Sequence, residues 1–431
     1  MVVSLFYIKL LDWFADELAY CTVVAIGLSQ FVVGYLIYTK SVDIEALDPS
    51  SSSVSYYLWG AVALWISGAI YCLCLCCNWA QLKLSVMVID VAADFVQDTR
   101  RIVIVPIAYF LVWCLCFWIW FYGFLGVASI SESDITVSSV RAQSKEVNRS
   151  EATNWMLFGM CFGMLWITSF IMAANEFALI AATITWYFSD KSKDANSVGS
   201  IAGEADVSLG VKWTYRYQAG TIALGSFILA IIWVVRAIFE YIGEKMMDAS
   251  GNNRATKCFI SCMRCCLDCF DRFIRYLNRN AYIYSCITSE SFCPSALQAF
   301  LLMLKNATKF GIVNTISTAF IYMAVGFVSV VTTLVGYFLL KWTQEVPVDT
   351  VAPCCLIFLI GYLVGTTFIS PFDVGANTIL QCYLIDKDVQ KRCNTDSKHL
   401  PHQLEDLMQK LKLGDSAEGG KGEKLLPNDM N

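Results

Sequence analysis

Charged residues are scarce in this 431-residue chain, and histidine is almost absent. Only 16% of the residues are charged, against about 25% in ordinary globular proteins. Both histidines, His399 and His402, lie in a polar C-terminal segment, so no apolar segment has an imidazole for metal ligation or nucleophile activation. An Asp-Gly dipeptide, a P-loop and a glycine-rich dinucleotide motif are also missing, which argues against phosphoalcohol transfer, ATP-driven pumping and nucleotide cofactors. We therefore expect no enzyme, no cofactor, no resident metal and no nucleic-acid partner.

Long runs without any charged side chain are present instead. About 20 apolar residues suffice for a helix to cross a bilayer, because a helix satisfies its own backbone hydrogen bonds where water is absent. Seven segments of this kind predict an all-α, polytopic transmembrane helical bundle. They are 18–39, 49–82, 102–128, 152–175 continuing past Glu176 to 189, 217–235, 310–340 and 350–372.

The ends of the chain differ from the predicted membrane domain, which we assign to 18–388. Residues 1–17 mix apolar and charged side chains and are expected to form a helix at the membrane interface. A second interfacial amphipathic helix is expected over 82–96, where apolar residues at helical spacing lie opposite two aspartates. Residues 389–431 are rich in polar and charged residues and predict a cytoplasmic tail.

The positions of lysine and arginine predict the orientation of the spans, because basic loops tend to stay in the cytoplasm. Loop 40–55 has one basic residue and is assigned outside, whereas 190–216 has four and is assigned inside. Loop 129–151 then lies outside, where Asn148 begins a glycosylation sequon unless the three-residue match is chance. Seven crossings would place the basic tail outside. We therefore expect an eighth span or a re-entrant segment over 281–304.

Nineteen cysteines are present, and five of them share one predicted helix face. Three interpretations are open: a metal site, acylation of thiols at the membrane boundary, and packing against lipid or another helix. Structural zinc sites place Cys-x-x-Cys pairs on turns rather than along a helix, which disfavours the metal. Acylation would fall on Cys265 and Cys266. The five cysteines are Cys258, Cys262, Cys265, Cys266 and Cys269.

Two acidic residues lie inside predicted spans, where an ionisable group is costly and marks a functional hypothesis. Glu176 either faces a cationic substrate or pairs with a basic residue such as Arg236. Asp373 follows Pro371, which removes a backbone hydrogen bond and is typical of the broken helices of transporters. The alternative for Asp373 is an interfacial cap on a helix that ends just before it. Arg236 is four residues from Glu240, and these two are expected to pair.

Aromatic residues make up 14% of the chain, and several fall deep inside the predicted spans. Ring faces together with a carboxylate form the usual receptor for a quaternary ammonium ion, which cannot donate a hydrogen bond. Interfacial belts and core packing are the alternatives. The predicted walls of such a cage are Trp166, Trp233, Tyr362 and Phe372.

Several short motifs in the second half of the chain resemble those of the choline transporter-like proteins. The most specific are Asn-Arg-Asn-Ala-Tyr at 278–282 and Phe-Cys-Pro-Ser-Ala at 292–296 in that order. The others are Arg-Tyr-Gln-Ala-Gly at 216–220, Leu-Gly-Ser at 224–226, Arg-Ala-Ile-Phe-Glu-Tyr at 236–241 and Thr-Ile-Leu-Gln-Cys-Tyr-Leu at 378–384. The similarity runs from about residue 18 to 388.

The resemblance implies a bundle of about ten helices that moves choline or ethanolamine across plasma or organelle membranes without sodium. It places Asp373 where the family usually has glutamate and Gln218 where it has histidine. It also implies a chain that begins after the first one or two spans of the family and lacks the large extracellular loop between them.

From these observations we predict a facilitative carrier for choline or a related small organic cation. Glu176 and Asp373 would neutralise the cation within the aromatic cage, and Gly361, Gly365 and Pro371 would act as hinges. Membrane lipids are expected partners. The alternative is a non-transporting structural subunit of a larger membrane complex, which would have other membrane subunits as partners.

Overall fold

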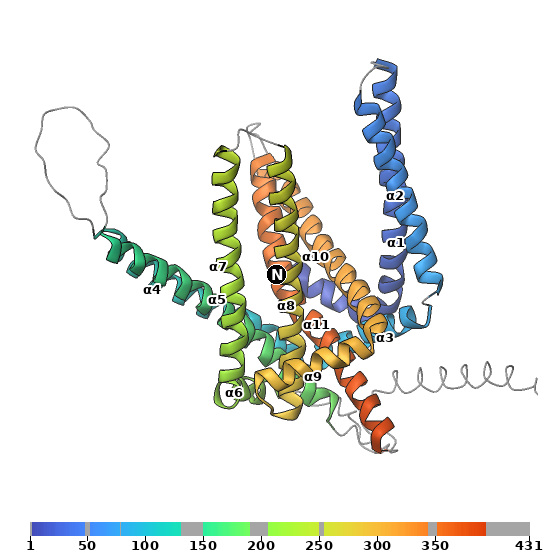
Figure 1. Cartoon of the computed structure of the whole chain (residues 1–431). Coiled ribbons are helices and arrows are strands. Elements are labelled where there is room, and N and C mark those ends of the chain that lie inside the picture. The colour runs from blue at the N-terminus through green and yellow to red at the C-terminus, as the bar shows by residue number, and fades with distance from the viewer. Residues whose placement is uncertain are drawn as a thin grey trace, which may run out of the picture. The chain divides into compact units, whose positions relative to one another are not determined.

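The computed structural model describes residues 2–47, 52–77, 79–130, 150–189, 206–249, 254–343 and 351–393 (Figure 1). Regular structure within these ranges is helical. The elements are α1 (Val2–Leu47), α2 (Ser52–Cys77), α3 (Trp79–Asp98), the 3-10 helix η1 (Arg100–Val103), α4 (Ile104–Ala128), α5 (Glu151–Tyr187), α6 (Val207–Arg216), α7 (Ala219–Ala249), α8 (Arg254–Thr288), α9 (Phe292–Lys305), α10 (Ala307–Thr343) and α11 (Val351–Cys393).

Seven helical segments are long and apolar enough to cross a membrane, and they confirm the seven predicted spans. They are Tyr20–Ile44, Val54–Cys77, Arg100–Ala128, Glu151–Tyr187, Ala219–Met247, Phe310–Trp342 and Val351–Val389. Because these segments satisfy their own backbone hydrogen bonds, the polytopic all-α class follows directly from them.

The predicted eighth span or re-entrant segment over 281–304 falls on a bent pair of helices, which passes the length and hydropathy requirements of a span only when the two helices are taken together. Thr256–Thr288 and Phe292–Lys305 meet at 110°. The break lies at Ser289, whose φ of 61° is in the left-handed region that helices avoid. The amide side chain of Gln218, at the start of α7, accepts a hydrogen bond from the Ser285 hydroxyl at 3.0 Å, just before this break.

The helices form two compact units, each described by itself. The first unit comprises Met1–Arg100, Trp186–Ala205 and Met303–Asn431, and α3 lies at its core. Val88, Ile89, Val91 and Phe95 of α3 are fully buried, and α3 packs against α1, α10 and α11. The segment 82–96 is therefore buried, because neighbouring helices of its unit cover it on several sides, and its expected place at the membrane interface stays a prediction. Figure 1 shows α3 lying at a steep angle to α10.

In the same unit, residues 2–17 are helical and continuous with the first span. Their expected place at the membrane interface stays a prediction. The helices α10 and α11 lie side by side (Figure 1). Gly361 of α11 would place a Cβ 3.4 Å from the Cα of Ser329, which shows how closely the two backbones approach. Small residues permit such close approach of helices in membranes.

The second unit comprises Arg101–Thr185 and Asp206–Leu302, which include α7 and α8. These two helices are neighbours along much of their length (Figure 1). Near one end of the pair, Gly243 of α7 faces Ile260 of α8. Towards the other end, the side-chain amide of Asn278 donates a hydrogen bond to the carbonyl of Gly225 at 3.0 Å. Residue numbers rise along α8 as they fall along α7 between these two contacts, which shows that the helices are antiparallel.

Candidate cation site on helices α5, α7 and α8

Glu176 lies on α5 inside a candidate span, and an arginine meets its charge. Its Oε1 accepts a hydrogen bond from Nε of Arg279 on α8. The side chains are 22% and 26% exposed, respectively, so the pair is partly buried but not sealed. Of the two alternatives that the sequence left open, the structure contains the ion pair, but with Arg279 instead of Arg236.

Trp233 on α7 faces a second arginine of α8. The guanidinium carbon of Arg275 lies 5.2 Å from the centroid of the Trp233 ring, within the range of a cation–π interaction. Nη2 of Arg275 is also 3.0 Å from Oδ2 of Asp271, which is one turn earlier on the same helix. Because positions four apart share a helix face, α8 carries two arginines one turn apart on one face, Arg275 and Arg279.

Arg236 joins α7 to α8 through a third ionic contact. Its Nε is 3.2 Å from Oε1 of Glu240, which confirms the predicted pairing of these two residues. Its Nη1 is also 2.9 Å from Oδ1 of Asp268 on α8. Along α8 the acids Asp268 and Asp271 precede the arginines Arg275 and Arg279, and every charge described above has an opposite charge or a ring against it.

Trp166 lies on α5 in a different place from the ion pair. Its indole N–H donates to the carbonyl of Ala223 at 3.3 Å, and its ring packs edge-on against Phe227 of α7. Ten residues along a helix correspond to about 15 Å, so Trp166 and Glu176 are too far apart for one choline-sized ion to touch both. The predicted cage is therefore not a single cluster.

Asp373, Tyr362 and Phe372 lie on α11 in the first unit. The helix continues past Phe372 to Cys393, so Asp373 is inside a helix and is not an interfacial cap. The amide of Asn377 donates to Asp373 Oδ1 at 3.3 Å. Phe372 is 3% exposed and packs against Phe320, whereas Tyr362 is 39% exposed. Their substrate-binding roles stay predictions.

Gly361 and Gly365 face α10, and Pro371 lies within the unbroken α11. A Cβ on Gly365 would be 3.5 Å from Val325 and Val328. Both glycines thus serve the close packing of the two helices. Movement about any of the three residues stays a prediction.

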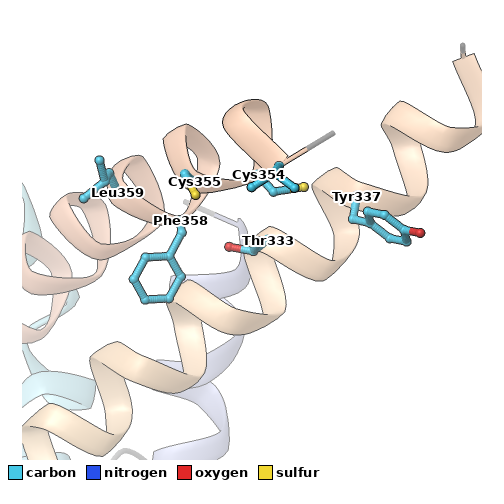
Figure 2. A pocket seen from close by; sticks show the side chains of 7 residues that line it. Thr333, Tyr337, Cys354, Cys355, Phe358 and Leu359 are labelled. Atoms are coloured by element: carbon cyan, nitrogen blue, oxygen red, sulfur yellow. The ribbon is translucent and has the colours of Figure 1, made fainter. Parts of the chain in front are cut away.

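A groove of about 580 Å³ opens between α10 and α11 (Figure 2). Figure 2 shows Thr333 and Tyr337 on one helix opposite Cys354, Cys355, Phe358 and Leu359 on the other. Val351 completes the lining. No carboxylate is among these residues, so the groove does not provide the charge that a small organic cation needs, and its apolar walls suit lipid chains.

The remaining predicted sites concern modification. Cys265 and Cys266 are exposed free thiols on α8, as are the other three cysteines of the cluster. In the parts of the chain that the structure describes, no three His, Cys, Asp or Glu side chains are placed to hold a metal ion. Lipidation at Cys265 and Cys266 stays a prediction. Asn148 lies outside the described residues.

These features define a multi-pass integral membrane protein in which charged side chains of neighbouring helices pair with one another. A family model described as "Plasma-membrane choline transporter" matches residues 62–388. The chain therefore belongs to this choline transporter family, as its motifs predicted.

Three relatives illustrate the similarity. Choline transporter-like protein 1 of Rattus norvegicus is 30% identical over 224 residues, covering 52% of this chain and 33% of the relative. Choline transporter-like protein 2 of Dictyostelium discoideum is 27% identical over 327 residues, covering 75% and 50%. That of Xenopus laevis is 24% identical over 468 residues, covering 95% and 64%. The chain thus spans from a third to just under two thirds of the length of these relatives.

Sequence reasoning found Glu176 and Trp233 but missed their two arginine partners. Arg279 is the arginine of the Asn-Arg-Asn-Ala-Tyr motif, and Arg275 precedes it by four residues. That spacing was a usable signal, because it places both guanidinium groups on one helix face. It did not show which neighbouring helix they face.

Proposed function

We propose that this chain carries choline or a related small organic cation across a membrane by facilitated transport. Family membership supports transport of choline at the level of the family, and the relatives that it matches are named as choline transporter-like proteins. Transporters of this kind need an intramembrane group that compensates a positive charge. Glu176 is our candidate for that group.

The observation that carries the proposal is the way α5 and α7 already hold cations. Glu176 holds the guanidinium of Arg279, and the ring of Trp233 holds that of Arg275. A carboxylate and an aromatic face are the two components that recognise a quaternary ammonium ion. Their occupation by arginine supports the inference that this part of the second unit is suited to positive charge.

Uptake of radiolabelled choline into proteoliposomes tests the proposal. We expect saturable uptake by the wild-type chain and a strong reduction in Glu176→Gln, which removes the negative charge at nearly constant volume. Glu244→Gln, at an exposed position of α7, is the matched control and is expected to keep uptake. Absence of saturable uptake by a wild-type protein that is folded and monodisperse would refute the proposal.

The alternative of a non-transporting subunit makes a different prediction. A subunit would purify in mild detergent with partners in fixed stoichiometry and would show no uptake after reconstitution. A carrier is expected to purify as a monomer or homo-oligomer and to transport alone. Size-exclusion chromatography with light scattering, followed by the uptake assay on the same sample, separates the two.

A further inference from the structure

The two arginines of α8 occupy the carboxylate and the ring that a cationic substrate would need. Arg279 pairs with Glu176 of α5, and Arg275 lies over Trp233 of α7. The arginines are one turn apart on one helix face. A single helix therefore supplies a positive group to both components at once.

We propose that Arg279 and Arg275 are tethered internal cations that compete with the substrate for Glu176 and Trp233. This inference rests on the proposed function. In the state described here the arginines hold the two groups. When choline binds, its quaternary ammonium takes the place of a guanidinium group, at Glu176 or at Trp233, and in the first case α8 loses its ionic contact with α5. Arg279 and Arg275 would thereby set the apparent affinity for the substrate.

The exchange suits the electrostatics of the pair. An ionised carboxylate left alone in a low-dielectric interior is strongly unfavourable, so Glu176 is released by one cation only when another takes its place. The pair is about one quarter exposed, which leaves a side from which a small ion can approach. Choline brings the same charge as arginine but no N–H donor, so the competition depends on charge and ring contact and not on hydrogen bonding.

The two arginines differ in how readily they are displaced. Arg275 keeps its ion pair with Asp271 if it leaves the ring of Trp233, because Asp271 is on the same helix, 3.0 Å away. Arg279 gives up its charge-assisted hydrogen bond to Glu176, and such bonds are roughly twice as strong as neutral ones. Arg279 is therefore the stronger competitor.

Choline binding to detergent-purified full-length variants, measured by isothermal titration, tests the inference. Arg279→Gln removes the stronger competitor and is expected to tighten choline binding about tenfold, and Arg275→Gln about threefold, as expected for losing a charge pair and a cation–π contact from the competing state. Arg279→Lys keeps the charge and is expected to bind close to wild type. Arg272→Gln, exposed on the same helix, is the matched control for a lost charge and is expected to change nothing.

Thermal unfolding of the same samples gives a second measurement. We expect Arg279→Gln to unfold at a lower temperature than wild type and to be stabilised more by choline, because the ligand then replaces the missing positive charge. If Arg279→Gln does not fold, the choline affinity of Arg275→Gln tests the inference: tighter binding than wild type supports the competition, and unchanged or weaker binding overturns it.

The outcomes separate this inference from the proposed function. Wild-type binding together with unchanged or weaker binding in folded Arg279→Gln and Arg275→Gln would overturn the competition and leave transport intact. Equal gains in Arg272→Gln would also overturn it, since the effect would then be one of net charge. If neither the wild type nor any variant binds choline or takes it up, the proposed function itself fails.

Discussion

The helix pairs α7–α8 and α10–α11 both use glycine to bring two long helices together, yet they differ in what fills the rest of the contact. Between α7 and α8 lie ionic and cation–π contacts, from Arg236–Asp268 to Arg275–Trp233. Between α10 and α11, the residues that line the groove are apolar or uncharged. The first pair is tied by charge and the second by close packing.

This difference indicates which of the two helix pairs is suited to bind a charged ligand. Paired charges in a low-dielectric region can be exchanged for another charge, whereas apolar packing offers an incoming ion nothing to compensate its lost hydration. This contrast supports our proposal that a cation binds in the second unit, on α5, α7 and α8. The groove between α10 and α11 has apolar or uncharged walls.

The largest effect is expected from breaking the Glu176–Arg279 pair. Either Glu176→Gln or Arg279→Gln should cost about 2 kcal/mol or more, because the partner is left with an uncompensated, partly buried charge. The double variant should cost less than the worse single variant, since no lone charge remains. Thermal unfolding in detergent measures all three.

The pair Lys305–Asp388 of the first unit is the comparison for that experiment. Its side chains are 58% and 20% exposed, respectively, and because the lysine reaches solvent we expect the pair to contribute about 0–1 kcal/mol. Lys305→Gln should therefore lower the unfolding temperature much less than Arg279→Gln. If the two variants lowered the unfolding temperature equally, the Glu176–Arg279 pair would contribute no more to stability than the Lys305–Asp388 pair.

The next largest effect is expected from Gly225→Ala on α7. A Cβ there would meet the hydroxyl of Tyr282 and lie 2.9 Å from the ring of Phe292, and both aromatic residues are buried. Overpacking of this kind typically costs about 1–3 kcal/mol. Gly220→Ala on the same helix meets no atom within 4 Å and should leave the unfolding temperature unchanged or higher. If Gly220→Ala lowered the unfolding temperature as much as Gly225→Ala, the cause would be the loss of glycine's backbone freedom and not a clash with Tyr282 and Phe292.

A smaller effect is expected at the equivalent contact of the other pair. In Gly336→Ala on α10 a Cβ would lie 2.7 Å from Cδ1 of Ile357, which is the end of a flexible side chain that can rotate away. We expect a loss of about 1 kcal/mol, with Gly326→Ala, which has open space around it, as the control. If Gly336→Ala were worse than Gly225→Ala, α10–α11 would be the more rigid pair.

The smallest effect concerns the start of α6, the short helix that precedes α7 in the chain. Asp206 caps this helix, and hydrogen bonds from the backbone N–H of Leu209 and the hydroxyl of Ser208 hold the pKa of its carboxyl below the usual value. The stabilisation is therefore complete above the ordinary aspartate pKa of about 3.9 and is lost as the pH falls through the lowered value.

Asp206→Ala should remove about 0.5–1 kcal/mol of local helix stability and abolish that pH dependence. Hydrogen exchange of α6 at several pH values measures both. Asp206→Asn, which can still accept the backbone hydrogen bond, is the control: it should keep most of the protection at neutral pH but lose the dependence on pH. A Cβ on Gly210 of α6 would lie 2.9 Å from the carbonyl oxygen of Ala178 on α5, so the two helices pack closely. Unchanged exchange in Asp206→Ala would show that such packing holds α6 without the cap.

Much of the fold was predictable because each span is a local property. The charge-free runs fixed seven membrane helices, and their limits in the structure differ mainly where charged residues extend a helix beyond the apolar run, as in α7 and α11. The burial of 82–96 among other helices was not predictable, because amphipathic spacing is the same for an interfacial helix and for a helix packed among others. The bend at Ser289 was missed because a single left-handed residue leaves no mark on hydropathy.

The candidate site was only partly predictable for a related reason. Glu176 and Trp233 stood out by residue type and depth, and the pairing of Arg236 with Glu240 followed from their spacing on one helix. The pairing of Glu176 with Arg279 joins residues about a hundred positions apart. Nothing local to either residue encodes it.

By itself the sequence determined that this chain is a membrane-embedded helical protein of the choline transporter family, because hydrophobic length and short motifs are read along the chain. Tertiary structure alone decided which charges meet. An ion pair between helices depends on which faces pack together, and that is settled by contacts such as Gly225 against Tyr282 rather than by the charged residues themselves.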